Sequence, residues 1–185
     1  FLAFIVTPYM LLKLGVEQFG VWTILSVLSS YVHLAEMGVG RTLIIFVSKF
    51  STGDNNKKIS EILSSAFAMN LFFGISTFFI FHFLKPILIN NLFKIPNEYV
   101  AEAAVVYSII LMVFIFNIIF SIFSSCINGM QRMEITSSIG ILSSFIQAIG
   151  VFIVLESENK LLGLAILQSF ISFITITLNF YFYRK

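Results

Sequence analysis

Charged side chains are scarce in this sequence. They make up 11% of its 185 residues, whereas an ordinary soluble domain carries about a quarter. Hydrophobic residues make up 58%, and most of them stand in runs long enough to cross the roughly 30 Å hydrocarbon layer of a membrane as a helix. The composition therefore excludes an ordinary water-soluble fold and predicts an all-α integral membrane bundle.

Cysteine and net charge are also low. The single cysteine, Cys126, has no partner for an internal disulfide and is expected to be a small packing residue. The net charge of +2 is small, and the basic residues stand mainly at the ends of apolar runs, which argues against a nucleic-acid partner. Strict polar–apolar alternation is absent, and the apolar runs are longer than the roughly 10-residue strands of a membrane barrel. These features favour helices.

Catalytic motifs are missing as well. The sequence has no phosphate-binding Gly-Lys loop, no His-Glu spacing typical of zinc sites and no nucleophile motif. Its acidic loop residues are isolated, whereas a membrane acyltransferase or glycosyltransferase would gather several His, Asp or Glu at one membrane face. We therefore expect no enzymatic activity, no cofactor and no metal ion.

Six apolar runs predict six transmembrane helices in a single lobe, residues 1–185. The first run is too short to cross alone and predicts the end of a truncated helix, which Pro8 would bend. The second is longer than one span at about 1.5 Å per residue, so it must tilt, break or project. Lys85-Pro86 ends the third, and the mixed segment 87–99 suits the membrane interface. The predicted helices cover residues 1–12, 19–47, 61–84, 100–128, 135–155 and 161–183, separated by polar turns at 13–18, 48–60, 129–134 and 156–160.

Lysine and arginine in short loops predict the orientation. The loops after the second, fourth and sixth predicted helices, together with the end of the chain, hold six of these residues. The loops on the other side hold four. This difference favours a cytoplasmic amino terminus, with both chain ends on the cytoplasmic face.

Three short motifs carry a family resemblance. Residues 14–22, LGVEQFGVW, resemble the turn between the first two helices of polysaccharide flippases. Tyr31 and residues 34–40, LAEMGVG, resemble a mid-helix pattern of that family in which Leu and an acidic residue precede Gly-aliphatic-Gly, although Glu36 stands where Asp is more usual. Residues 129–132, GMQR, resemble the cytoplasmic turn between the fourth and fifth helices.

The resemblance covers the whole sequence and implies one half of a two-lobe transporter. The superfamily also holds multidrug exporters and the lipid II flippase, and its members have two six-helix lobes around a central cavity. The resemblance therefore implies an amino-terminal lobe that translocates lipid-linked oligosaccharide or polysaccharide precursors across the cytoplasmic membrane by alternating access. Its expected partners are a lipid-pyrophosphate-linked glycan, membrane lipids and a carboxy-terminal lobe of the same chain.

Arg41 is the strongest candidate for contact with such a substrate. An arginine at the centre of a span costs about 2.5–3.5 kcal/mol on insertion scales, so its presence invites a functional hypothesis. In a regular helix Ser26, Ser30, His33 and Arg41 share one face, which would line a wet cavity. The guanidinium binds phosphate oxygens through paired hydrogen bonds, as a pyrophosphate carrier requires. The alternative is that Arg41 snorkels to lipid headgroups.

Other polar residues within the apolar runs have two interpretations each. Glu36 would pair with Arg41 or with nearby backbone, and His33 would act as a proton relay or as a hydrogen-bonded packing residue. Two polar edges recur at helical spacing, and in lipid they should face protein or water, either as substrate contacts or as ordinary interhelical packing. The edges are Asn117, Ser121, Ser124 and Asn128, and Gln168, Ser172, Thr175 and Asn179. The candidate substrate-binding residues are thus Ser30, His33, Glu36, Arg41, Asn117 and Gln168.

Two other functions remain open. A multidrug or cation exporter of the same superfamily would favour acidic residues in its cavity, and Glu36 is the one carboxylate that the sequence places deep in a span. A non-transporting membrane scaffold is the second alternative. A full-length sequence with a second set of six helices would argue against the scaffold.

Overall fold

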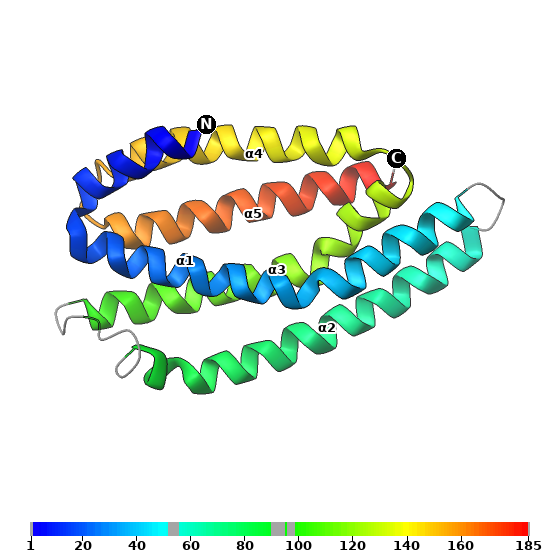
Figure 1. Ribbon diagram of the computed structural model, residues 1–185, viewed down its shortest axis with the longest axis horizontal. Coiled ribbons are helices and arrows are strands. Elements are labelled where there is room, and N and C mark those ends of the chain that lie inside the picture. The colour runs from blue at the N-terminus through cyan, green and yellow to red at the C-terminus, as the bar shows by residue number, and fades with distance from the viewer. Residues whose placement is uncertain (1, 52–55, 90–94, 96–98, 185) are drawn as a thin grey trace.

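The computed structural model describes residues 2–51, 56–89, 95 and 99–184, and only the backbone of residues 2, 3, 28–37 and 56 among them. Apart from short turns, this part of the chain is helical, and it contains no strand. The prediction of an all-α bundle is therefore confirmed (Figure 1). The elements are α1 (Leu2–Phe50), α2 (Asn56–Ile87), α3 (Val100–Gly129), α4 (Met133–Val154) and α5 (Lys160–Arg184).

The element α1 consists of two helical segments joined at Gly15. This residue has φ 76° and ψ 169°, a conformation that glycine adopts without the steric cost borne by other residues. The segment before Gly15 folds back along α4, where the Tyr9 and Phe152 rings lie 4.5 Å apart (Figure 1). The predicted turn at 13–18 is wrong in length, because one glycine reverses the chain and its polar neighbours stay helical.

Two other predicted boundaries are also wrong. The loop expected at 48–60 is shorter, because α1 continues to Phe50 and α2 begins at Asn56. The physical reason is burial: Ile59 packs in the same apolar cluster as Val47, which extends the packed stripe of each helix toward the turn. Pro86 does not end the third predicted helix, since α2 runs through it to Ile87.

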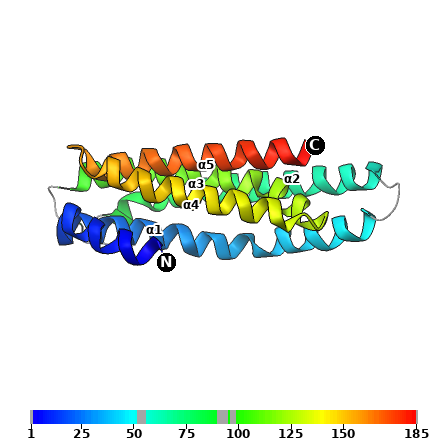
Figure 2. The same ribbon diagram turned by 90° about the horizontal axis from the view of Figure 1, so that it is seen from above.

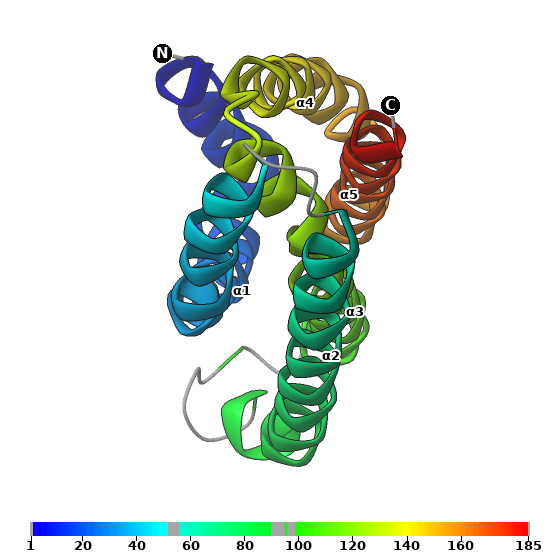
Figure 3. The same ribbon diagram turned by 90° about the vertical axis from the view of Figure 1, so that its right-hand side faces the viewer.

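The helices lie side by side along one long axis (Figure 2). Helix α3 packs against each of the other four elements and forms the centre of the bundle. Seen from the end, the longer segment of α1 stands on one side, with α2 and α3 opposite and α4 and α5 closing the top (Figure 3). The α3–α4 turn lies at the same end of the bundle as the last residues of α1 and the first residues of α2, as predicted (Figure 1).

Two apolar clusters hold the helices together. One lies at the Gly15 end and includes Val106 and Leu111 of α3. The other lies toward the opposite end and includes Ile122 and Cys126 of the same helix. Cys126 is fully buried, as expected for a packing residue. The stretch of α3 between the clusters carries Asn117, so polar side chains occupy the middle of the bundle.

The outer surface is strongly apolar. Large aromatic and aliphatic side chains are exposed along every helix, and Phe4, Phe72, Phe83, Ile153 and Phe173 are each more than two-thirds exposed. By length and composition, five stretches of the described chain are suited to cross a membrane. Water does not favour such a surface, whereas lipid chains do. The surface therefore fits a bilayer.

Candidate functional site

The polar edges of α3 and α5 meet inside the bundle. Ser172 Oγ of α5 donates a hydrogen bond to Asn117 Oδ1 of α3 at 2.9 Å. Beside this bond lies a cavity of about 250 Å³ between the two helices. The prediction that these edges face the bundle interior is confirmed for the residues that line the cavity or bond across helices. The cavity is lined by Asn117, Phe120, Ser121, Ser124, Thr175, Ile176 and Asn179.

Hydrogen bonds extend this polar layer to α4. The hydroxyls of Ser143 in α4 and Thr175 in α5 lie 2.9 Å apart. Nearer the α3–α4 turn, Thr136 Oγ1 donates to Asn128 Oδ1 at 2.6 Å. Buried polar groups in lipid require such partners, because no bulk water can replace them. The layer therefore joins three helices.

Asn70 of α2 belongs to this polar layer and is absent from the predicted site residues. This side chain is 2% exposed, and its Nδ2 donates to the Ile118 carbonyl oxygen at 2.8 Å and to Ser121 Oγ at 3.3 Å. The available signal was a lone asparagine inside the predicted helix 61–84. The residues three and four positions away from Asn70 are Ala66, Phe67, Phe73 and Gly74, so no polar edge at helical spacing marked this position.

The two edge residues predicted as substrate contacts differ in position. Asn117 lines the cavity and is hydrogen-bonded. Gln168 is half-buried on α5 and does not line the cavity. Both roles stay predictions, and Asn117 has the better placement for contact with a polar ligand.

Arg41 lies on an exposed face of α1. Leu43, two residues further on, is 2% exposed. Side chains two positions apart in a helix point in directions about 200° apart, so Arg41 points away from the core that Leu43 enters. The backbone is helical from Val16 to Phe50, so Ser30 and His33 keep the predicted angular relation to Arg41. The side chains of Ser30, His33 and Glu36 lie outside the described residues.

An apolar groove runs between α1 and α2 next to this face. Its volume is about 630 Å³, and its lining includes Thr42, Phe46, Phe73 and one carboxylate, Glu61. Gly38 opens it on the α1 side. Arg41 itself does not line the groove. The groove therefore has a largely apolar wall with a single acidic group at its α2 side.

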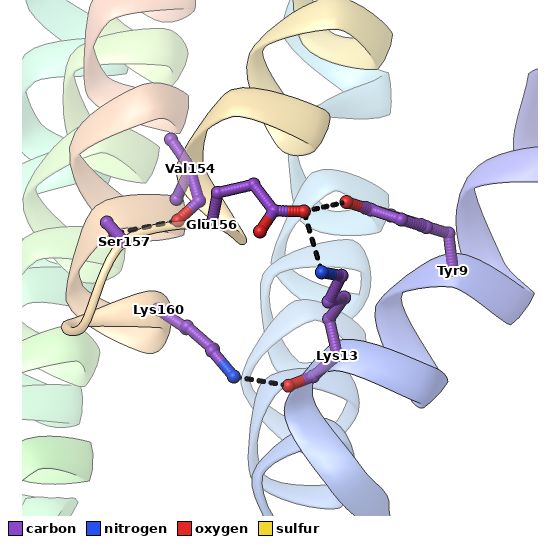
Figure 4. Close-up of polar contacts among 6 residues, drawn as sticks. All are labelled: Tyr9, Lys13, Val154, Glu156, Ser157 and Lys160. Carbon is purple, nitrogen blue, oxygen red and sulfur yellow. Dashed lines mark hydrogen bonds and ion pairs between the residues drawn. The ribbon is translucent and has the colours of Figure 1, made fainter.

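A polar corner closes the end of the bundle at Gly15 (Figure 4). Glu156, in the α4–α5 turn, forms an ion pair with Lys13 at 2.6 Å and accepts a hydrogen bond from the Tyr9 hydroxyl at 2.9 Å. Lys160 Nζ donates to the Lys13 carbonyl oxygen at 2.6 Å. The bonds from Lys13 and then Tyr9 lower the pKa of Glu156 below its usual range. The corner fastens the first segment of α1 to the α4–α5 turn.

Within the described ranges, no three or more His, Cys, Asp or Glu side chains gather closely enough to hold a metal ion together. The polar layer instead consists of amides and hydroxyls. Its chemistry is that of hydrogen bonding and of neutral oxygen ligands.

These features define a multi-pass membrane protein: long apolar helices, an apolar outer surface, and polar side chains enclosed between helices. The chain belongs to the polysaccharide biosynthesis protein family, whose model matches residues 1–185. This membership confirms the family resemblance and gives the protein a role in polysaccharide synthesis or export. Comparisons with curated proteins and with solved structures found no match.

Proposed function

We propose that this chain forms one lobe of a transporter that moves lipid-linked oligosaccharide or polysaccharide precursors across the cytoplasmic membrane by alternating access. Family membership supports a task in polysaccharide assembly. A polar layer among apolar helices supports transport, since polar groups at that depth suit a polar cargo or its coupling ion. The proposed activity breaks no covalent bond. A second lobe of the same protein would complete the central cavity.

The position of Arg41 carries the proposal. Gly129, the last residue of α3, packs against Val47 of α1. Val47 therefore lies level with that end of the bundle. At 1.5 Å rise per residue, Arg41 lies about 9 Å further into the bundle than Val47. The pyrophosphate of a lipid carrier lies at headgroup level, with its polyprenyl tail in the bilayer. An exposed arginine just inside that level is suited to receive the pyrophosphate.

The chemistry of the guanidinium fits this step. It stays charged at physiological pH and donates two parallel hydrogen bonds to neighbouring phosphate oxygens. Ser30 and His33 share its helical face and would contact the first sugar or the second phosphate. The glycan, which is rich in hydroxyls, would pass polar residues such as Asn117, and the lipid tail would stay outside the bundle.

Substitution of Arg41 in the full-length protein tests this role. Arg41→Ala should abolish or strongly reduce surface display of the glycan, and Arg41→Lys should retain part of it, because the charge remains but the paired donors are lost. Protein level in the membrane is measured alongside glycan display. Arg132→Ala is the matched control, since it removes an exposed arginine from the turn at the same end and should transport normally.

Two results would contradict the proposal at different levels. Normal display by a well-expressed Arg41→Ala variant would end the pyrophosphate-contact role, leaving snorkelling as the explanation. Unchanged glycan display after deletion of the whole gene would end the transport assignment itself.

The groove between α1 and α2 favours a second candidate, export of lipophilic cations. A carboxylate in an apolar groove with aromatic walls is the chemistry that binds such molecules, and Glu61, Phe46 and Phe73 supply it. Glu61→Gln would then lower resistance of cells to cationic dyes and leave glycan display unchanged. Loss of glycan display with normal dye resistance would contradict this candidate.

A further inference from the structure

The ammonium group of Lys85 is held inside one end of the bundle. Lys85 stands two residues before the end of α2, and its Nζ donates a hydrogen bond to Ser108 Oγ of α3 at 2.9 Å. Ser108 lies eight positions after Val100, where α3 begins, or about 12 Å along the helix. The side chain is therefore bonded to a hydroxyl within the bundle, whereas a lysine that snorkels extends toward water.

This ammonium keeps two further hydrogens. An ammonium has three donors, and Ser108 takes one of them. The Ser108 hydroxyl gives its own hydrogen to the Ala104 carbonyl oxygen at 2.9 Å, so its oxygen is free to accept. Among the described residues, no carboxylate forms an ion pair with Lys85. A positive charge at this depth favours an anion as its partner.

An apolar groove along α3 and α5 begins beside the ammonium. Its volume is about 710 Å³, and Ser108 lines it at the end nearest to the start of α3. Met112, Phe116 and Phe173 line it further on, and each is more than half exposed. From Ser108 to Phe120 the groove follows twelve positions of α3, or about 18 Å. One leaflet of a roughly 30 Å hydrocarbon layer is about 15 Å thick, so the groove has the length of one lipid chain.

The hydroxyl groups in the groove offer no hydrogen to a polar ligand. The hydrogen of Ser108 is already used. Ser169 Oγ donates to the Ala165 carbonyl oxygen and Ser172 Oγ to Asn117 Oδ1, each at 2.9 Å. The other lining residues are aliphatic, Met or Phe. A glycan would lose hydrogen bonds to water here without full replacement, whereas a hydrocarbon chain has none to lose.

We propose that the groove binds one acyl chain of a membrane phospholipid whose phosphate is held by Lys85. The ammonium supplies a positive charge and two hydrogens that phosphate oxygens accept. Helix α3 has 30 residues and is about 45 Å long, about 15 Å more than the hydrocarbon layer. If both ends share this excess, Ser108 lies about 5 Å inside the hydrocarbon edge, within reach of a headgroup phosphate for a lysine. The lipid lies in the leaflet at the Gly15 end, away from Arg41.

Photo-crosslinking of the purified full-length protein in detergent micelles tests this site. The probe is phosphatidylglycerol with a diazirine on one acyl chain, and mass spectrometry locates the labelled peptides. Labels should fall on the peptides that contain Phe116 and Phe173. Unlabelled phosphatidylglycerol should compete, and diacylglycerol, which lacks the phosphate, should not. Lys85→Gln should reduce labelling about fivefold, and Lys85→Arg should retain it. Lys57→Gln, at the other end of α2, should label as the wild type does.

A second variant tests the groove with Lys85 intact. Met112→Trp fills the groove and should reduce labelling, whereas Ile141→Trp, at an exposed position of α4 outside the groove, should not. Labelling that is unchanged by Lys85→Gln would overturn the proposal. So would stronger competition by a polyprenyl pyrophosphate than by phosphatidylglycerol, since the groove would then hold the tail of a transported lipid. Either result leaves the glycan-transport proposal standing, since that rests on Arg41.

Discussion

A single buried amide can join two helices in lipid. The Asn70 nitrogen bonds both a carbonyl oxygen of α3 and the Ser121 hydroxyl. Such interhelical bonds in membranes contribute about 0.6–2 kcal/mol. Asn70 thereby fixes the rotation of α2 against α3 beside the polar cavity. A polar residue in this bundle can therefore stabilise helix packing without binding a ligand. The contacts of each side chain decide which role it has.

Glu156 makes the polar corner sensitive to acid. Its pKa is lowered in the folded protein by Lys13 and Tyr9, so the corner contributes stability above the unfolded-state pKa and loses it as pH falls through the lower folded-state pKa. We expect the melting temperature of the purified protein to fall between neutral pH and about pH 3, and Glu156→Gln to remove part of that dependence. Thermal melting across this range is the measurement.

A nearby carboxylate provides the control for this effect. Glu158 is exposed in the same turn, and none of the bonds that form the corner involves it. Glu158→Gln should keep the full pH dependence. An identical pH profile for wild type and Glu156→Gln would show that the corner adds no stability in solution.

At the scale of helices, small residues set the closest approaches. A Cβ added at Gly129 of α3 would lie 2.7 Å from Val47 Cβ of α1, and one at Gly163 of α5 would lie 2.6 Å from Val154 Cγ1 of α4. At Gly40 the corresponding distance to Ser125 Oγ is 3.1 Å. Small residues at crossings allow membrane helices to pack tightly without a hydrophobic driving force between them.

Gly129→Ala should destabilise the α1–α3 contact. The new methyl group has no room beside Val47, and overpacking of this kind costs about 1–3 kcal/mol. Gly140→Ala in α4 is the matched control, because nothing lies within 4 Å of its Cβ position and alanine favours the helix. Melting in detergent should fall for Gly129→Ala and stay level or rise for Gly140→Ala. Equal melting of both variants would contradict the close packing at Gly129.

The helices themselves were predictable from the sequence, and their ends were less so. Long apolar runs have few alternatives to a helix in lipid, which is why α3, α4 and α5 stand close to their predicted ranges. The polar stretch 13–18 suggested a longer turn, although one positive φ at Gly15 suffices. Burial of Ile59 is a tertiary contact that no local pattern shows, and it extends α2 toward Asn56.

At the scale of the whole molecule, lysine and arginine residues gather at the two ends of the bundle. Lys57 and Lys58 stand at the start of α2 and Arg132 in the α3–α4 turn, both at one end of the bundle, whereas Lys13 and Lys160 meet at the other end. The apolar outer surface lies between these ends. The arrangement places both groups of lysine and arginine where a bilayer would end, and the larger group marks the side predicted to face the cytoplasm.

Cysteine labelling tests this orientation. Lys57→Cys and Arg132→Cys in the full-length protein should resist a membrane-impermeant maleimide in right-side-out vesicles and react after permeabilisation. Glu158→Cys should react in intact vesicles. The natural Cys126 is fully buried, so background labelling should be low. Labelling of positions 57 and 132 from opposite faces would refute the topology, and labelling of both in intact vesicles would reverse the orientation.

The candidate site was predictable in part. Spacing alone identified the edges that contain Asn117 and Asn179, because polar residues in a lipid-spanning helix must turn toward protein. It did not show that the two edges face each other across one cavity, which depends on the parallel packing of α3 and α5. That the buried Asn179 oxygen has no hydrogen-bond partner among the described residues is likewise a property of the packed bundle.

The polar corner also bears on the order in which the protein is made. Tyr9 and Glu156 are separated by 147 positions in the chain, as are Lys13 and Lys160. The ribosome therefore completes α2, α3 and α4 before the first helical segment gains these partners. Until then, the segment before Gly15 lacks these polar partners. Its docking through these bonds can follow only after the α4–α5 turn has been synthesised.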